Sequence, residues 1–391
     1  MHYHKYFEMK NLILVLFLSV GTTVVGQNID TLAIMSKNFD KERIVYVHKS
    51  SFYKYQSNKI KLPVIYILDG QHEWFVNPIL NTIKYLQYTH EIPQALIVVI
   101  PLENRIKECA IQSLEGVALP LHKFITEELD SVLSTYHSNG IKLLIGHSFS
   151  ASFSLYSYCQ SPDYYSAVFA NSPADKLKSL AAFFLENKID LTKIYLSVGG
   201  IDEGKDKAHR KLFNTIEKEM PSFINSMHVY KANTSTHNSV PIVSNPIFFS
   251  ELFKNFKTRY AHIAKIDQEY KLIKTPISIE REISKFKKSS LLLDQPYSME
   301  LPEFNGFCSK YENSGLNNYA IKLYENALEL YPNYYEFHLY IAELMLNTNV
   351  TSAINHLKKS KQLIQSFEQE LEEKDEILNK IEALLKTATN K

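Results

Sequence analysis

Cysteine, glycine and tryptophan are scarce in this chain of 391 residues, which contains 3, 11 and 1 of them respectively. The cysteines, at positions 109, 159 and 308, are too few and too widely spaced for a disulfide framework or a metal-binding cluster. The motifs H-E-x-x-H, paired C-x-x-C and G-x-G-x-x-G are also missing, so we expect neither a metal nor a cofactor.

An excess of charge of one sign is missing as well. The 43 lysines and arginines nearly balance the 42 aspartates and glutamates, and the formal net charge is +1 with histidine neutral. We therefore expect no nucleic-acid partner and no attraction to an anionic membrane surface. The length leaves room for one large domain with a smaller appendage.

The N-terminus has the pattern of a signal peptide. Lys5 and Lys10 precede an apolar run over residues 12–20, which is too short to span a bilayer comfortably, and small residues lead up to Gly26. We expect cleavage near Gly26, a mature chain that begins near Gln27, and a periplasmic or secreted protein without a stable membrane span. An uncleaved anchor is the alternative. A lipoprotein is disfavoured because no cysteine directly follows the apolar run.

The segment Gly146-His-Ser-Phe-Ser150 carries the most specific signal in the chain. It follows the apolar run 141–145 and precedes a helix-like run, and this strand–turn–helix order presents the nucleophilic serine of α/β-hydrolases. Ser148 would lie at the apex of the turn, and Gly146 is needed where a Cβ would clash with the turn. An ordinary strand–helix junction with an exposed serine is the alternative.

Short apolar runs alternate with helix-like segments along the first two thirds of the chain. The predicted strands cover residues 43–47, 63–68, 95–100, 141–145, 167–170, 193–198 and 227–230. Continuous apolar runs are typical of strands buried on both faces, and the alternation with helices predicts an α/β fold with a mainly parallel sheet. A helix is expected over 119–136, and another over 246–260.

The remaining third reads as helices behind a charged stretch. Ala320, Tyr324, Ala327 and Pro332 are spaced as in the second helix of a tetratricopeptide-like unit. These helices are expected to lean on the first domain, either as a structural cap or as a groove for a protein partner. The predicted division is a signal peptide (1–26), an α/β-hydrolase domain (27–262), a linker (263–301) and a small all-α region (302–391).

Nucleophilic catalysis by serine needs a base and a carboxylate, which follow the serine along the chain in this fold. His237 is the predicted base because it lies in a polar loop after the last strand, whereas His228 lies inside that strand and His209 in a charged helix. The acid is expected just after the strand 193–198, where Asp202 is favoured, then Glu203, then Asp206. Simple capping of the next helix by these carboxylates is the alternative.

The developing oxyanion needs backbone N–H donors. One is expected from Phe149, directly after the nucleophile, and a second from the loop that begins Asp69-Gly70, with Gly70 allowing close approach and Gln71 or His72 offering the N–H. A mere turn at this loop is the alternative.

Several separated segments together resemble the Putative esterase family of α/β-hydrolases, which includes the esterase D and enterochelin-esterase groups. The segments are Val64-Ile-Tyr-Ile-Leu-Asp-Gly70, Ile97-Val-Val-Ile-Pro-Leu-Glu-Asn104-Arg105, Phe124-x-x-Glu127, Gly146-His-Ser-Phe149, Asn171-Ser172-Pro173 and His237-Asn-Ser-Val-Pro241. The resemblance covers about residues 30 to 260 and extends less securely to the C-terminal helices, which often follow this domain in secreted Bacteroidetes-type members. It implies that Ser148 is the nucleophile, that His237 is the base and that the acid lies at Asp202 or Glu203.

Two departures from the family pattern are expected to matter. Ser150 and Ala151 replace the usual glycines of the elbow, and the segment after Arg105 differs from the family sequence. The expected function is hydrolysis of a small carboxylic ester, such as a siderophore, an acylated sugar or a short-chain ester. An inactive scaffold that binds a cell-envelope partner and an acyltransferase are the alternatives.

Overall fold

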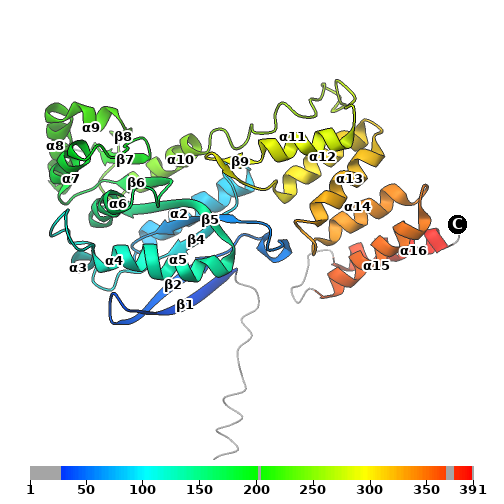
Figure 1. Cartoon of the computed structure of the whole chain (residues 1–391), viewed down its shortest axis with the longest axis horizontal. Helices are drawn as coiled ribbons and strands as arrows, with labels where there is room; N and C mark the ends of the chain where they lie inside the picture. Colours follow the sequence, from blue (N-terminus) through cyan, green and yellow to red (C-terminus); the bar gives the residue numbers. More distant parts are fainter. Residues whose placement is uncertain (1–27, 201–203, 367–373, 390–391) are drawn as a thin grey trace, which may run out of the picture.

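A computed structural model describes residues 28–200, 204–366 and 374–389, and Figure 1 shows two adjoining parts, a sheet domain followed by a helical region. The predicted signal peptide lies outside the described residues. None of the helices in the described ranges has the length and apolar content needed to cross a bilayer.

Eight strands form one sheet in the order β1-β2-β4-β3-β5-β6-β7-β8. At one edge, β1 pairs antiparallel with β2, and β2 pairs antiparallel with β4. The strands β4, β3, β5, β6, β7 and β8 all run parallel to one another, which confirms the predicted mainly parallel sheet. The strands are β1 (Ile29–Ser36), β2 (Lys41–His48), β3 (Leu62–Ile67), β4 (Leu96–Val99), β5 (Ser138–His147), β6 (Ala167–Asn171), β7 (Ile194–Gly199) and β8 (His228–Ala232). The central strands β3, β4, β6 and β7 are buried along their whole length, as their continuous apolar runs require.

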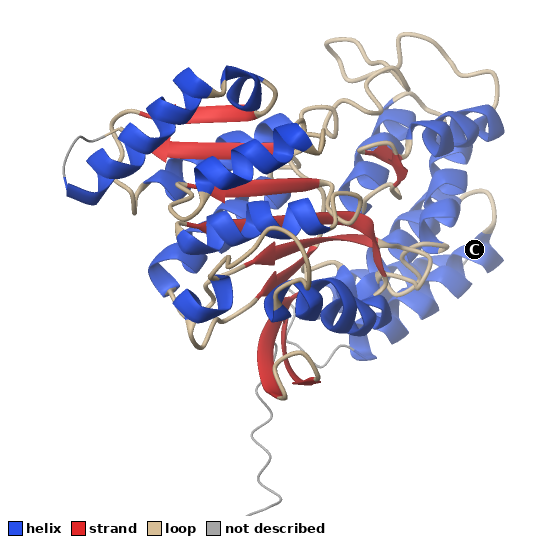
Figure 2. Ribbon diagram, turned by 60° about the vertical axis from the view of Figure 1, so that its left-hand side comes forward, coloured by secondary structure: helices blue, strands red, loops and turns tan. Residues whose placement is uncertain are grey.

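Helices cover both faces of the sheet (Figure 2). One face packs against α2 (Glu73–Tyr88) and α10 (Val240–Leu252), and the other against α6 (Phe149–Gln160), α7 (Leu177–Glu186) and α8 (Gly204–Glu219). The helix predicted over 119–136 is present as α4 (Pro120–Lys123), a π-helical turn (Phe124–Leu129), α5 (Asp130–Leu133) and a 3₁₀ turn (Ser134–Tyr136). The expected start at Pro246 is wrong: α10 begins at Val240 with Pro241 in its first turn, and Pro246 lies inside the helix.

The segment predicted as a linker contains ordered structure. It includes α11 (Ile279–Ser289) and a hairpin of β9 (Leu291–Leu292) and β10 (Gln295–Pro296). The helical region continues with α12 (Leu301–Asn313), α13 (Asn317–Leu328), α14 (Tyr335–Met345), α15 (Val350–Ser366) and α16 (Lys374–Thr389). The last helix packs on its neighbours, because Ile381 belongs to the apolar cluster formed with α14 and α15.

The helical region packs directly on the sheet domain. Tyr55 and Tyr334 meet edge to face with ring centroids 5.0 Å apart. The buried carboxylate of Glu300, just before α12, accepts hydrogen bonds from the backbone N–H of Gln94 at 2.6 Å and from the hydroxyl of Tyr297 at 2.5 Å. Because Gln94 belongs to the sheet domain, this carboxylate joins the two parts of the molecule.

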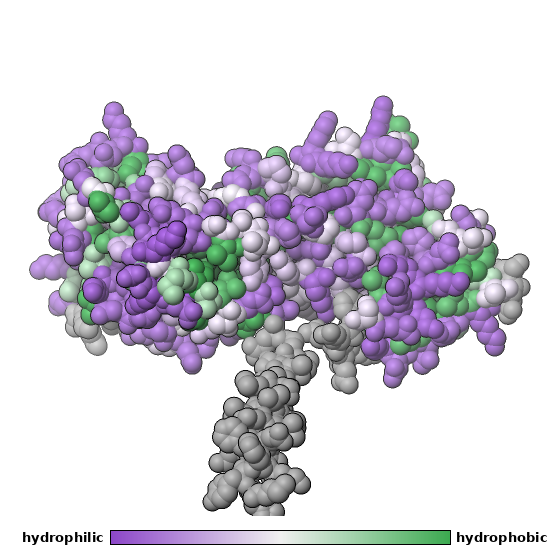
Figure 3. Space-filling model, turned by 60° about the horizontal axis from the view of Figure 1, so that its bottom comes forward, coloured by the Kyte–Doolittle hydropathy of each residue, from purple (hydrophilic) through white to green (hydrophobic). Residues whose placement is uncertain are grey.

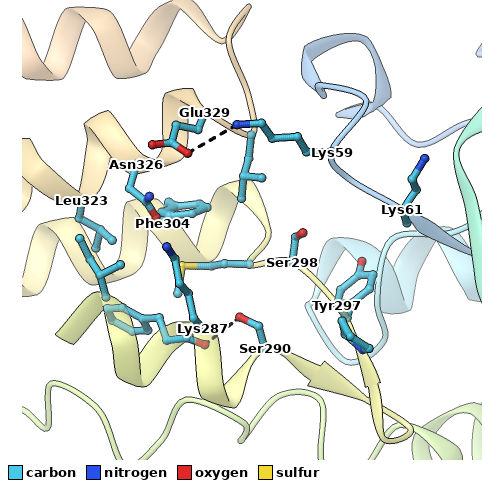
Figure 4. A pocket seen from close by; sticks show the side chains of 15 residues that line it. Lys59, Lys61, Lys287, Ser290, Tyr297, Ser298, Phe304, Leu323, Asn326 and Glu329 are labelled. Carbon is cyan, nitrogen blue, oxygen red and sulfur yellow. Dashed lines mark hydrogen bonds and ion pairs between the residues drawn. The ribbon is translucent and has the colours of Figure 1, made fainter. Parts of the chain in front are cut away.

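A cavity of about 350 Å³ remains at this junction (Figure 4). Phe304 and Leu323 contribute to its apolar wall, whereas Lys59 and Lys61 reach it from the sheet domain. Lys59 lies 3.6 Å from the carboxylate of Glu329 across the junction, and both side chains are exposed. The face drawn in Figure 3 is mostly hydrophilic, with apolar side chains in separate patches over both parts.

Candidate active site

Ser148 occupies a strained turn between β5 and α6. Its backbone dihedral angles are φ 59° and ψ −116°, a conformation that side-chain-bearing residues rarely adopt. Its N–H donates to the carbonyl of Asn171 on the neighbouring strand β6 at 2.9 Å, which holds the turn against the sheet. The residue is 7% exposed, and it opens onto a cavity at the carboxyl end of the strands. This is the geometry of a nucleophile elbow.

Gly146 is required by the close approach of the helix to the strand. A Cβ at this position would lie 2.4 Å from the carbonyl oxygen of Ser150 and 2.5 Å from its carbonyl carbon. Backbone atoms cannot move away without disturbing the turn, so the sequence-based reason for this glycine is confirmed.

Ser150, at a position where the resemblance leads us to expect glycine, is buried and its hydroxyl is hydrogen-bonded. Its hydroxyl accepts from the N–H of His147 at 2.8 Å and donates to Asp69 Oδ2 at 2.6 Å. Asp69 is 1% exposed and is paired with Arg105, whose Nε lies 2.6 Å from Oδ1 and whose Nη2 also donates to the carbonyl of His147 at 2.7 Å. Ser150, Asp69 and Arg105 together form a network beneath the elbow, so the replacement of glycine adds contacts to the turn.

The predicted oxyanion donors differ in their availability. Phe149 is the first residue of α6, and the first intrahelical bond runs from Ser152 N–H to Ser148 O, so the N–H of Phe149 has no acceptor within its helix. The N–H of Gly70 donates to the carbonyl of Ile100 at 3.0 Å, so Gly70 belongs to the predicted oxyanion loop without offering its own N–H. The N–H of His72, the other predicted donor, donates to the carbonyl of Asp69 at 2.8 Å, so Gln71 stays the predicted donor of this loop. The Gln71 side chain anchors the loop by accepting from Leu102 N–H at 2.8 Å.

Gly70 still serves close approach, as expected from the sequence. A Cβ there would lie 2.7 Å from the backbone nitrogen of Pro101. The glycine therefore lets the loop after β3 cross the end of β4.

The loop that carries His237 lies against the end of β7. Gly200 N–H donates to the carbonyl of Ser235 at 3.0 Å, and a Cβ at Gly200 would lie 2.2 Å from the Cα of Asn233. From the elbow, the Nε2–H of His147 donates to the carbonyl of His237 at 2.8 Å. Burial lowers the pKa of His147 to about 4, so this imidazole is neutral near pH 7 and keeps one N–H for that bond.

His209 is a site residue that sequence reasoning missed. It projects from α8, and its Nδ1 lies 2.7 Å from the Nδ1 of His237, with the ring centroids 4.2 Å apart. The two residues are 28 positions apart along the chain, and only the packing of α8 beside the loop brings them together. His228, in contrast, stacks on Tyr195 and contacts Glu251, as expected for a histidine packed within a strand.

Ser148, His237 and His209 line one cavity of about 690 Å³. Its further lining residues are Trp74, Arg105, His147, Phe149, Ala174, Asp175, Thr236 and Asn238. Among the described residues Ser148 Oγ makes no hydrogen bond to His237, although both face this cavity; such bonds often tighten only with substrate bound.

The predicted acids follow the end of β7. Asp202 and Glu203 lie outside the described residues, as does the side chain of Asp206. The strand that precedes them, β7, does end beside the loop of His237. In the part of the chain that the structure describes, no group of three or more histidine, cysteine, aspartate or glutamate side chains is arranged to hold a metal ion.

Comparison with known proteins identifies the fold and the family. The chain matches the model of the Esterase family, described as "Putative esterase", over residues 36–238. It resembles an IroE-like serine hydrolase from Shewanella oneidensis with a TM-score of 0.56 and 17% identity, over 75% of this chain and 97% of that one. It also resembles an uncharacterised protein from Capnocytophaga ochracea with a TM-score of 0.53 and 12% identity, over 91% and 99% of the two chains. A search of curated proteins finds no match.

Proposed function

Because the chain belongs to the Esterase family, we propose that it is a serine esterase that hydrolyses small carboxylic esters through an acyl-enzyme on Ser148. The observation that carries the proposal is the strained elbow, which turns Ser148 into the same cavity as His237. Strain at a side-chain-bearing residue persists only where the surroundings enforce it, and here β6 and Gly146 do so.

We propose the following reaction. Ser148 Oγ attacks the acyl carbon while His237 Nε2 takes its proton, and the N–H groups of Phe149 and Gln71 stabilise the oxyanion. The tetrahedral intermediate expels the alcohol, which receives the proton from His237. Water then attacks the acyl-enzyme with His237 again as base, releasing a carboxylic acid and restoring Ser148. An oxyanion-hole donor typically lowers such a barrier by about 3 kcal/mol.

A carboxylate is proposed to stabilise the imidazolium of His237. Asp202 and Glu203 are the first candidates and Asp206 the third, because all follow β7, whose end lies beside the loop of His237. Replacing each by its amide identifies the acid as the residue whose loss costs most activity.

The proposed substrate is a small ester: a siderophore, an acylated sugar or a short-chain ester. Trp74 and Phe149 give the cavity apolar walls, and Arg105, whose charge is paired with Asp69, also lines it. The proposed location is periplasmic or secreted, after removal of residues 1–26. The helical region is proposed as structural support for the esterase domain.

Hydrolysis of a panel of para-nitrophenyl esters tests the function. The wild-type protein should hydrolyse one or more esters of the panel. In Ser148→Ala and in His237→Ala, kcat/KM should fall about 10³-fold or more. The matched control is His228→Asn, since this histidine lies outside the cavity, and it should behave as wild type. Failure of the folded wild type to hydrolyse any ester of the panel would count against an esterase.

A further inference from the structure

We propose that His209 is a positioning residue for His237: it holds the imidazole of His237 in the tautomer with the proton on Nδ1 and the lone pair on Nε2. The inference rests on the serine-esterase function proposed above, and it assigns a role to a histidine that no catalytic motif of the sequence includes. Its basis is the contact between the two Nδ1 atoms at 2.7 Å.

Two ring nitrogens at this distance share one hydrogen. A neutral imidazole carries a proton on one nitrogen and a lone pair on the other, so one Nδ1 must donate and the other must accept. The ring planes are inclined by 46° with centroids 4.2 Å apart, and both rings line the cavity that contains Ser148.

The direction of this hydrogen bond decides whether His237 can act as a base. If His237 Nδ1–H donates to His209, the lone pair of His237 lies on Nε2, where it can accept the proton of Ser148. If His209 donates instead, the proton of His237 lies on Nε2 and proton abstraction is blocked. The hydrogen-bond partner of one ring nitrogen decides which of the two nitrogens carries the proton. We assign this role to His209.

The surroundings hold both rings in place for this purpose. Arg210, the next residue of α8, donates from Nε to the carbonyl of Gly199 at 2.6 Å and from Nη1 to Asn233 Oδ1 at 3.1 Å. These bonds fix α8 to the end of β7 and to the loop of His237. The ring of His237 also lies near His147, with centroids 4.6 Å apart. The imidazole of His237 is thus in contact with two other histidine rings.

This arrangement divides the work of orienting the base. A carboxylate after β7 would supply negative charge to the imidazolium, whereas His209, as the acceptor of the Nδ1–H, would fix the direction in which Nε2 points. Loss of His209 should therefore slow the proton transfer and leave substrate binding nearly unchanged.

Three substitutions at one position test the proposal. An asparagine amide sits close to where Nδ1 of a histidine lies, whereas a glutamine amide sits close to Nε2. We expect kcat for para-nitrophenyl acetate and the rate of labelling by a fluorophosphonate to fall about 10- to 100-fold in His209→Ala and His209→Gln, with KM within about twofold of wild type. His209→Asn should restore most of the rate, and His228→Asn should match wild type.

The tautomer itself can be observed by NMR of isotope-labelled histidine near neutral pH. We expect His237 to be protonated on Nδ1 in wild type and in His209→Asn, and to lose that preference in His209→Ala. Wild-type kinetics and an unchanged tautomer in His209→Ala would overturn the role of His209. A folded wild type that reacts with no ester and no fluorophosphonate would instead defeat the esterase function, while the NMR spectra would still decide the contact.

Discussion

At the scale of single residues, the backbone of Ser148 stores strain that neighbouring contacts offset. A positive φ at a residue with a Cβ costs on the order of 1–3 kcal/mol. The bond to Asn171 from the next strand and the Ser150 hydroxyl between His147 and Asp69 oppose that cost. The strain is therefore imposed by the sheet and the helix together, and it keeps the Ser148 side chain at the cavity.

Gly146 gives a direct test of this view. Gly146→Ala should slow fluorophosphonate labelling about 10²-fold, because the new Cβ meets backbone atoms of Ser150 and shifts the elbow. We also expect a loss of about 2 kcal/mol in unfolding free energy. Gly306→Ala is the matched control, since nothing lies within 4 Å of a Cβ there and alanine favours the helix. Equal labelling of the two variants would contradict the account.

The burial of His122 leads us to expect that the stability of the protein falls in acid. It is buried beside Ser157, with Nδ1 2.8 Å from Oγ, and burial lowers its pKa from 6.5 to about 4. The folded state disfavours protonation of the His122 imidazole. The free energy of unfolding is therefore not reduced by this residue above pH 6.5, and it falls as the pH drops from 6.5 towards 4.

Urea unfolding at about pH 7 and about pH 5 measures this effect. Between these two pH values, the loss of unfolding free energy should be smaller by on the order of 2 kcal/mol in His122→Gln than in wild type. The variant His262→Gln, which changes an exposed residue, should show the same loss as wild type. An unchanged slope in His122→Gln would show that other groups carry the acid sensitivity.

At the scale of elements, the proposed catalytic groups lie where strand ends and loops converge. The sequence was sufficient to predict the central strands, because burial on both faces demands long apolar runs. It did not reveal β1, an edge strand with much of its length exposed, or α11, whose charged residues suggested a linker. The elbow could be predicted because its requirements are local, whereas the contact of His209 with His237 depends on how α8 packs.

Gly200 tests the placement of the His237 loop. Gly200→Ala should push the loop away from β7, since the Cβ would lie 2.2 Å from Asn233 Cα. We expect kcat/KM to fall at least about tenfold while circular dichroism remains that of a folded protein. The comparison with Gly306→Ala controls for the added methyl group, and an unaffected kcat/KM would show that the loop tolerates the displacement.

At the scale of the whole molecule, the helical region and the sheet domain share one apolar core. Buried side chains from both parts, including Tyr55 and Phe304, belong to the same cluster. Glu300 adds a polar joint, since its carboxylate accepts from Gln94 and Tyr297 with 2% of its surface exposed. The sequence suggested that these helices lean on the first domain, but it could not reveal the role of Glu300, because Gln94 lies 206 positions away along the chain.

Two carboxylates at the junction form a matched pair for testing this joint. Glu300→Ala should lower the unfolding free energy by about 3 kcal/mol, because the buried Gln94 N–H loses its acceptor and the Tyr297 hydroxyl keeps only its 3.1 Å contact with the carbonyl of Gln94. Glu329→Ala removes an exposed partner of Lys59 and should change the unfolding free energy by less than about 1 kcal/mol. Urea or thermal unfolding measures both, and equal effects would contradict a joint centred on Glu300.

The most direct test of the central claim is labelling of the purified protein by a fluorophosphonate, followed by mapping of the modified peptide. The account predicts one labelled peptide, which contains Ser148, with labelling lost in Ser148→Ala and retained in the surface variant Ser134→Ala. Absence of labelling in the folded wild type, or labelling that persists in Ser148→Ala, would contradict the claim that this elbow presents an activated serine.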